Sequence, residues 1–117
     1  MILLQRVYDK ETSTAGRRFL IDRLWPRGIK KSNLQCDAWL KEVAPSTELR
    51  AWYHREPDKW EEFRKRYFME LDANPGSWQP ILEAAIKGTV ILLYSSRETM
   101  HNNAVALKEY IEREMPH

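Results

Sequence analysis

The chain has 117 residues, of which 43% are apolar and 31% are charged, with a net charge of +2. This size and apolar content predict one folded α/β domain over residues 1–117 and argue against a disordered chain. Its apolar runs are too short for a membrane span or a signal peptide, and its single cysteine, Cys36, cannot form an internal disulfide. We therefore expect a cytoplasmic protein without a membrane partner.

Three segments have the pattern of β-strands. Residues 2–8 alternate in polarity, and residues 9–16 after them are typical of a turn or loop. Residues 18–24 form a second predicted strand, which a Trp-Pro-Arg-Gly turn ends. Residues 89–94 are apolar without alternation, which indicates a central strand buried on both faces.

Two helices are predicted in the middle of the chain. The first begins at Ser46, and the second follows Pro57, which suits a first helical position. Apolar side chains recur through the second helix at three- and four-residue steps, at Trp60, Phe63, Tyr67 and Leu71. The stretch 33–43 has no pattern long enough to assign.

Two further helices complete the prediction. One is capped by Ser77 and stopped by Gly88, and the other runs from about Thr99 to Glu114. Ser95 and Glu98 have the spacing of a capping box ahead of the last helix.

The order of elements is strand, loop, strand, several helices, strand, helix. A buried apolar strand followed directly by an amphipathic helix is typical of α/β proteins. We expect a small, at least partly parallel sheet of about three strands covered by helices, with Rossmann-like layering.

The first candidate for function is the run Asp22-Arg23-Leu24-Trp25-Pro26-Arg27-Gly28. Ligands of open α/β sheets bind beyond the carboxyl ends of the strands. Arg23 and Arg27 offer planar donors that match phosphate or carboxylate, and Trp25 offers a face for stacking. Asp22 has apolar neighbours and needs a partner, for which we expect an arginine. The alternative is a structural Asp–Arg pair with Trp25 filling a gap.

The second candidate is the segment from Tyr94 to Asn103, where a central strand leads into a predicted helix N-terminus. Free backbone N–H groups and the helix dipole favour an anion at such a position. His101 and Asn102 lie at the start of this predicted helix. Hydroxyl donors accompany them at Ser95, Ser96 and Thr99. The alternative is an ordinary capped helix with a histidine facing solvent.

Other chemistries have less support. The three histidines show no metal-ligand spacing, so no metal site is predicted, and no cofactor is identified. Cys36 has no neighbouring residues that mark a nucleophile, and we expect an inert thiol. A Ser95–His101–Asp22 triad lacks the sequence of a nucleophile elbow.

The motif Asp-Arg-Leu-Trp-Pro-Arg-Gly resembles the YeaO-like family of bacterial proteins, within the group named domain of unknown function 488. Arg6-Val7-Tyr8-Asp9, Trp39-Leu40-Lys41-Glu42 and His101-Asn102-Asn103-Ala104 extend the resemblance over essentially the whole chain. It implies a fold and a site but no activity. The positions that match the family's motifs are Arg6, Asp22, Arg23, Trp25, Arg27, Lys41, Arg50, Tyr94, His101 and Asn102.

The chain departs from the broader group at two places. The resemblance implies a cysteine at the position of Tyr94 and Cys-His-Arg at residues 102–104, where this chain has Asn-Asn-Ala. This departure argues against thiol or metal chemistry.

The leading hypothesis is a pocket for a small anionic ligand, such as a nucleotide or another phosphorylated metabolite. His101 is the expected proton carrier if catalysis occurs, with Asp22 orienting it or an arginine, because histidine exchanges protons near neutral pH. Whether the protein is an enzyme stays open. The expected ligand contacts are Arg6, Arg23, Trp25, Arg27, Tyr94, Ser95, Arg97 and Asn102.

Two other functions remain open. Five tryptophans in so short a chain suggest an interaction module or a homodimer that buries them. Residues 17–31 hold six basic side chains and one acidic one, which with Trp25 suggests nucleic-acid binding.

Overall fold

The computed structural model describes residues 1–10 and 15–116. In this part of the chain, four strands form one sheet in the order β1-β4-β2-β3, and each neighbouring pair is parallel. The α/β class and the parallel sheet are confirmed, with four strands in place of about three. The strands are β1 (Ile2–Arg6), β2 (Arg17–Leu20), β3 (Ala38–Trp39) and β4 (Val90–Tyr94).

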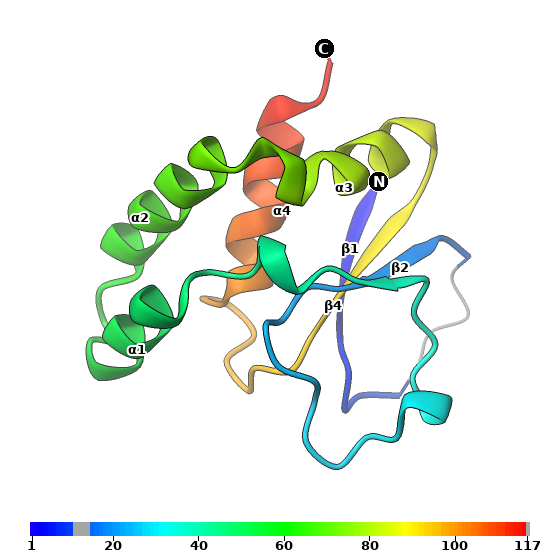
Figure 1. Ribbon diagram of the computed structural model, residues 1–117, viewed down its shortest axis with the longest axis horizontal. Coiled ribbons are helices and arrows are strands. Elements are labelled where there is room, and N and C mark those ends of the chain that lie inside the picture. The colour runs from blue at the N-terminus through cyan, green and yellow to red at the C-terminus, as the bar shows by residue number, and fades with distance from the viewer. Residues whose placement is uncertain (11–14, 117) are drawn as a thin grey trace.

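The α-helices lie over one face of this sheet and to one side of it (Figure 1). The α-helices are α1 (Thr47–Arg55), α2 (Trp60–Ala73), α3 (Pro75–Lys87) and α4 (Asn103–Glu114), and the 3-10 helices are η1 (Lys31–Asn33) and η2 (Lys41–Val43). Helices α3 and α4 contact the sheet, whereas α1 packs against α2 to one side of it. None of the described helices has both the length and the apolar character needed to cross a membrane.

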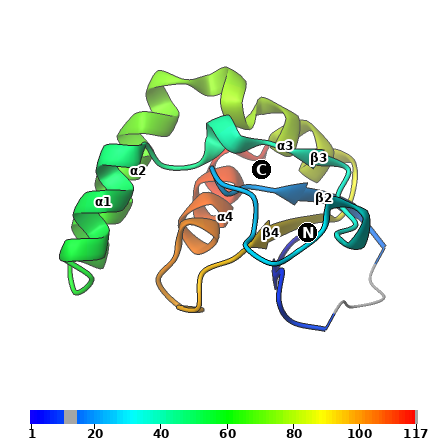
Figure 2. The same ribbon diagram turned by 60° about the horizontal axis from the view of Figure 1, so that its bottom comes forward.

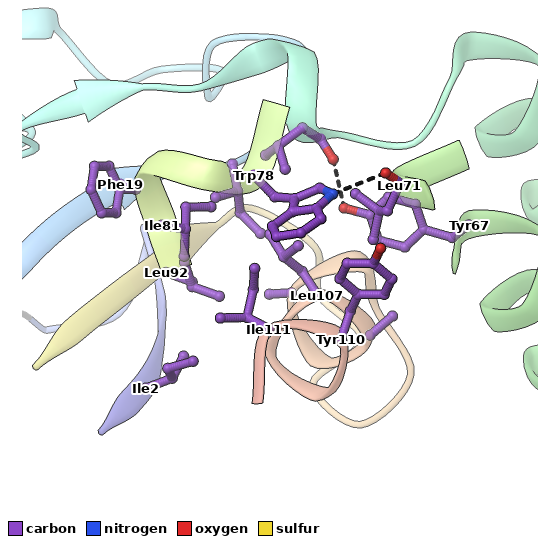
Figure 3. Close-up of a cluster of buried hydrophobic side chains, with 14 of the residues drawn as sticks. Ile2, Phe19, Tyr67, Leu71, Trp78, Ile81, Leu92, Leu107, Tyr110 and Ile111 are labelled. Atoms are coloured by element: carbon purple, nitrogen blue, oxygen red, sulfur yellow. Dashed lines mark hydrogen bonds between the residues drawn. The ribbon is translucent and has the colours of Figure 1, made fainter. Parts of the chain in front are cut away.

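The main core lies between one face of the sheet and α2, α3 and α4 (Figure 3). Trp78 fills its centre, and its indole N–H donates to the carbonyl of Leu71 at 2.9 Å. The predicted apolar stripe of α2 is confirmed as core, because Phe63, Tyr67 and Leu71 are buried. Other buried side chains of this core are Ile2, Phe19, Ile81, Leu92, Leu107 and Ile111.

The second face of the sheet is covered by loop segments, in the part of the chain that the structure describes. Leu20, Ile91 and Leu93 point to this face and are covered by side chains that include Trp25 and Trp39. Trp25 lies on the segment that joins β2 to β3, which Figure 2 shows looping out beside the sheet, and Trp39 lies in β3 itself. The rings of Trp25 and Trp39 meet edge to face at 5.5 Å between centroids. Strand β4 is therefore buried on both faces, as predicted.

The first two strands are shorter than predicted. The backbone N–H of Ile21 still donates to the carbonyl of Leu93 at 3.1 Å, but the chain then leaves the sheet. Asp22 therefore lies beyond the end of β2, not within it. Strand β3 was not predicted, because two residues carry no readable period.

Several helix starts also differ from the prediction. Helix α2 begins at Trp60, and Pro57 lies in the turn before it instead of at the first helical position. Helix α3 begins at Pro75, so Ser77 lies inside its first turn. Helix α4 begins at Asn103, four residues after the predicted start, because the side chain of Asn102 caps it by accepting from the N–H of Val105 at 2.9 Å.

The segment before α4 is consequently a loop. Ser95 and Glu98 form no capping box, because Ser95 donates to Asp22 whereas the Glu98 carboxylate accepts from the N–H groups of Met100 and His101. Helix α1 begins at Thr47, one residue after the predicted start, because Ser46 caps it: its hydroxyl accepts from the N–H of Leu49 at 3.1 Å.

Candidate functional site

The carboxyl ends of the parallel strands meet at one edge of the sheet, and a cleft of about 1320 Å³ opens there. The loops that follow β1, β2, β3 and β4 line one part of this cleft, and α1 lines another. This is the position at which open α/β sheets bind their ligands. The Trp25–Arg27 turn and the loop before α4 both line the cleft, as the hypothesis of one shared pocket requires.

The cleft is strongly basic although the chain is nearly neutral. Among the described residues, two carboxylates line it, those of Asp22 and Glu98, together with the histidines His54 and His101. The arginines that line it are Arg6, Arg23, Arg27, Arg50, Arg55 and Arg97. A concave surface with such an excess of one sign concentrates ligands of the opposite charge.

Asp22 is held at the floor of the cleft by neutral donors. Residue 22 is level with residue 95, because the parallel register pairs Leu20 with Leu93. One carboxylate oxygen of Asp22 accepts from the backbone N–H of Ser95 at 2.9 Å and from its hydroxyl at 2.6 Å. The other accepts from the side-chain amide of Asn103 at 3.0 Å. The expected arginine partner is therefore wrong, because the register brings Ser95 to this carboxylate.

Arg23 and Arg6 are tied to the backbone of the cleft walls. Arg23 donates to the carbonyls of Ala44 and Pro45 at 3.2 and 3.3 Å, which holds the chain after η2 against the Asp22–Arg27 segment. Arg6 donates to the carbonyl of Ser96 at 3.0 Å. Both guanidinium groups line the cleft, and their positions are fixed by these bonds.

Four other arginines of the cleft are exposed: Arg27, Arg50, Arg55 and Arg97. Within the described part of the chain, their guanidinium groups have no hydrogen bond or ion pair. They are thus available to an anion, and guanidinium forks match phosphate and carboxylate oxygens in pairs.

The Trp25–Arg27 turn is held from both ends. The hydroxyl of Tyr8 donates to the carbonyl of Arg27 at 2.7 Å, and the indole N–H of Trp25 donates to the carbonyl of Ile29 at 2.6 Å. Trp25 lines the cleft and also covers the second face of the sheet. The predicted packing role of Trp25 is therefore present, and its stacking on a ligand stays a prediction.

His101 joins the loop before α4 to the α1–α2 pair. Its ring stacks on Trp60, with centroids 4.9 Å apart and an interplanar angle of 16°. Its carbonyl accepts from the hydroxyl of Tyr53 at 3.2 Å. The backbone hydrogen bonds from Met100 and His101 lower the pKa of the Glu98 carboxyl, so this loop is ordered around an anionic side chain.

Tyr94 and Asn102 lie deeper than their predicted roles suggest. Tyr94 does not line the cleft, because it ends β4 on the same face as Leu92 and is buried against the helices. Burial, followed by the nearby Asp9 carboxylate, raises the pKa of its phenol. Asn102 does line the cleft but is only 3% exposed, and it caps α4.

Helix α1 supplies cleft residues that the sequence reasoning missed. Arg50 was known only as a position of the family motif, and His54 and Arg55 were not singled out. The signal was present, because Thr47, Arg50 and His54 recur at three- to four-residue steps, and Ala51 and Arg55 are four residues apart on the adjoining face. What the sequence did not show is that this face turns toward the sheet edge.

The described residues offer little for metal or thiol chemistry. They contain no group of three side chains suited to hold a metal ion. Cys36 packs on the second face of the sheet beside Leu20, Ile91 and Leu93, and burial raises the pKa of its thiol.

The protein is therefore an α/β protein with a parallel sheet and an arginine-lined cleft at the carboxyl edge of that sheet. The chain belongs to the DUF488-N3i family, whose description is "Inactive DUF488-N3 subclade" and whose model matches residues 1–117. Membership of the broader group that the sequence resembles is thus confirmed.

Similar proteins support the same assignment. The chain is 42% identical over 110 residues to the uncharacterized protein YeaO of Escherichia coli strain K12, across 94% of this chain and 96% of that protein. It is 46% identical over 70 residues to the uncharacterized protein Rv3073c of Mycobacterium tuberculosis, across 60% of this chain and 59% of that protein. No solved structure gives a significant match.

Proposed function

We propose that this protein binds a small anionic ligand, a nucleotide or another phosphorylated metabolite, in the cleft at the carboxyl edge of its sheet. The observation that carries the proposal is the set of exposed guanidinium groups of Arg27, Arg50, Arg55 and Arg97 around one cavity. Keeping like charges together is unfavourable, so the arrangement is best explained by a counter-charge on a ligand.

The geometry favours binding over catalysis. Among the described residues, no hydrogen bond joins the two residues named for catalysis: the His101 ring stacks on Trp60, and the Asp22 carboxylate accepts from Ser95 and Asn103. The family description uses the word "inactive". A proton-transfer role for His101 and Asp22 remains a weaker form of the proposal.

Calorimetric titration and thermal unfolding with pyrophosphate, nucleotides and sugar phosphates test the binding. We expect a ligand at a hundred times its Kd to raise Tm by about 10 °C, since such saturation stabilises the folded state by about 2.7 kcal/mol. Replacing Arg50 or Arg27 by glutamine should weaken binding about tenfold, because each change removes a charged hydrogen bond.

Lys87→Gln is the matched control. It removes one positive charge from the end of α3, and Lys87 does not line the cleft. If Lys87→Gln and Arg50→Gln weaken binding equally, the arginine acts only through the net charge of the protein. Absence of binding to every anion tested would remove the proposed function.

Single-stranded nucleic acid is the second candidate, and the size of the cleft favours it. About 1320 Å³ exceeds the usual range of small-molecule pockets, which is roughly 300–1000 Å³. An oligonucleotide should then bind with a steep dependence on salt, measurable by gel shift. Lack of retardation at low salt would exclude this candidate.

A homodimer that buries surplus tryptophans has less to support it. Each tryptophan has a partner within its own chain: Trp25 packs on Trp39, Trp60 on His101, Trp52 under Arg66, and Trp78 in the core. Light scattering over a dilution series tests the oligomeric state.

We also propose that residues 1–117 form one domain and that the protein acts in the cytoplasm.

A further inference from the structure

The floor of the cleft differs chemically from its walls, and this difference bears on which ligand fits. The inference rests on the proposed function, because it concerns the same cavity. The walls carry guanidinium donors, whereas the floor presents the carboxylate of Asp22 beside the side-chain amide of Asn103.

Asp22 retains capacity to accept a further hydrogen bond. A carboxylate offers about four acceptor positions. Ser95 and Asn103 occupy three of them: two donors reach one oxygen, and a single donor reaches the other at 3.0 Å. Asp22 is only partly buried and lines the cavity, so the remaining position on the second oxygen is open to a ligand.

Charge restricts what can occupy that position. A phosphate placed against the Asp22 carboxylate would meet a like charge, so the anionic group belongs with the exposed arginines of the walls. An ammonium group would suit Asp22 but would lie among the arginines of the same cavity. A neutral donor satisfies both constraints, and a hydroxyl is the neutral donor that phosphorylated metabolites carry most often.

We propose that the ligand is a phosphorylated sugar, free or within a nucleotide, whose hydroxyl donates to Asp22 while its phosphate lies on the wall arginines. Asp22 is then a specificity-determining residue, which separates sugar phosphates from simple polyphosphates. An acidic side chain that accepts from a ribose hydroxyl beyond a strand end is an established solution in other α/β folds.

The test compares two matched ligands on the unaltered protein. Adenosine monophosphate and its 2′,3′-dideoxy analogue share the base and the phosphate and differ only in the sugar hydroxyls. We expect the hydroxylated member to bind about tenfold more tightly, as the loss of one hydrogen bond to a charged group predicts. Ribose 5-phosphate and pyrophosphate are titrated in parallel.

Asp22→Asn supplies the second measurement. This variant should abolish the preference within the matched pair and tighten the binding of pyrophosphate, because it removes a negative charge from the cavity. Thermal unfolding of the free variant establishes that it is folded, and the comparison on the unaltered protein does not depend on it.

The outcomes separate the two proposals. If pyrophosphate binds but the matched pair binds equally well, the role of Asp22 is wrong and the anion-binding function stands. If neither pyrophosphate nor any sugar phosphate binds, both proposals fail. A preference for the hydroxylated ligand that persists in Asp22→Asn would assign the hydroxyl to another residue and overturn the inference.

Discussion

Ser95 donates both its backbone N–H and its hydroxyl to a single carboxylate oxygen of Asp22, at 2.9 and 2.6 Å. These residues follow neighbouring parallel strands, β4 and β2. The contact joins the two chain segments just beyond the carboxyl edge of the sheet. A hydroxyl bonded to a carboxylate forms one of the stronger hydrogen bonds in proteins. The Asp22–Ser95 contact therefore links the stability of the sheet to the shape of the cleft floor.

Ser95→Ala should lower the free energy of unfolding by about 1.5 kcal/mol, because a partly buried carboxylate loses one of its donors. Urea denaturation followed by circular dichroism measures the change. Ser77→Ala is the matched control, since its hydroxyl donates to the exposed carbonyl of Asn74 in the first turn of α3. A loss from Ser95→Ala no larger than that from Ser77→Ala would contradict the importance of this bond.

Trp25→Ala should lower the free energy of unfolding by about 3 kcal/mol, because it uncovers the second face of the sheet at Leu20, Ile91 and Leu93. Trp25→Phe keeps an aromatic ring against Trp39 but removes the indole hydrogen bond to Ile29. Its free energy of unfolding should therefore fall by only about 1 kcal/mol. Chemical denaturation of both variants gives the comparison. Equal losses would mean that the ring does not cover the sheet.

Tyr67→Phe should make the protein less sensitive to alkaline unfolding. Burial, with the Glu70 carboxylate second, raises the pKa of Tyr67 far above its ordinary value of 10.0. The folded protein keeps this phenol protonated while the unfolded chain ionises, so its contribution is complete below about pH 10 and is lost as the pH rises further.

Stability measured between about pH 9 and pH 12 checks the expectation. In the unaltered protein, this phenol should steepen the fall by up to about 1.4 kcal/mol per pH unit, and the variant should lack that part. At neutral pH the variant should be about 1 kcal/mol less stable, because the Tyr67 hydroxyl donates to the buried carbonyl of Val43 at 2.6 Å. An unchanged alkaline slope would contradict the assignment.

Much of the fold was predictable because several elements carry long, unambiguous patterns. Strand β4 is a continuous apolar run, and α2 repeats Phe63, Tyr67 and Leu71 on one face. The start of α4 was less accessible, because Ser95, Thr99 and Asn102 are all suitable caps and only the tertiary contact between Ser95 and Asp22 decides among them.

The position of the candidate cleft was predictable from the sequence, but not every residue that lines it. The rule that ligands bind beyond strand ends correctly brought the Asp22–Arg27 segment and the Ser95–His101 loop together. The contribution of α1 depends on contacts far apart in sequence, such as the Glu70 carboxylate that accepts from the backbone N–H and the hydroxyl of Ser46. No local pattern reveals that such a contact turns Arg50 toward the cleft.

The placement of β4 between β1 and β2 has a consequence for how the molecule is made. The first two strands have no ladder between them, and the segment that joins them into one sheet is synthesised near the end of the chain. During synthesis, β1 and β2 therefore cannot join one sheet until residues 90–94 have emerged from the ribosome. Assembly of this sheet is a late, long-range event, and protein that terminates before β4 should be cleared or aggregate instead of folding in part.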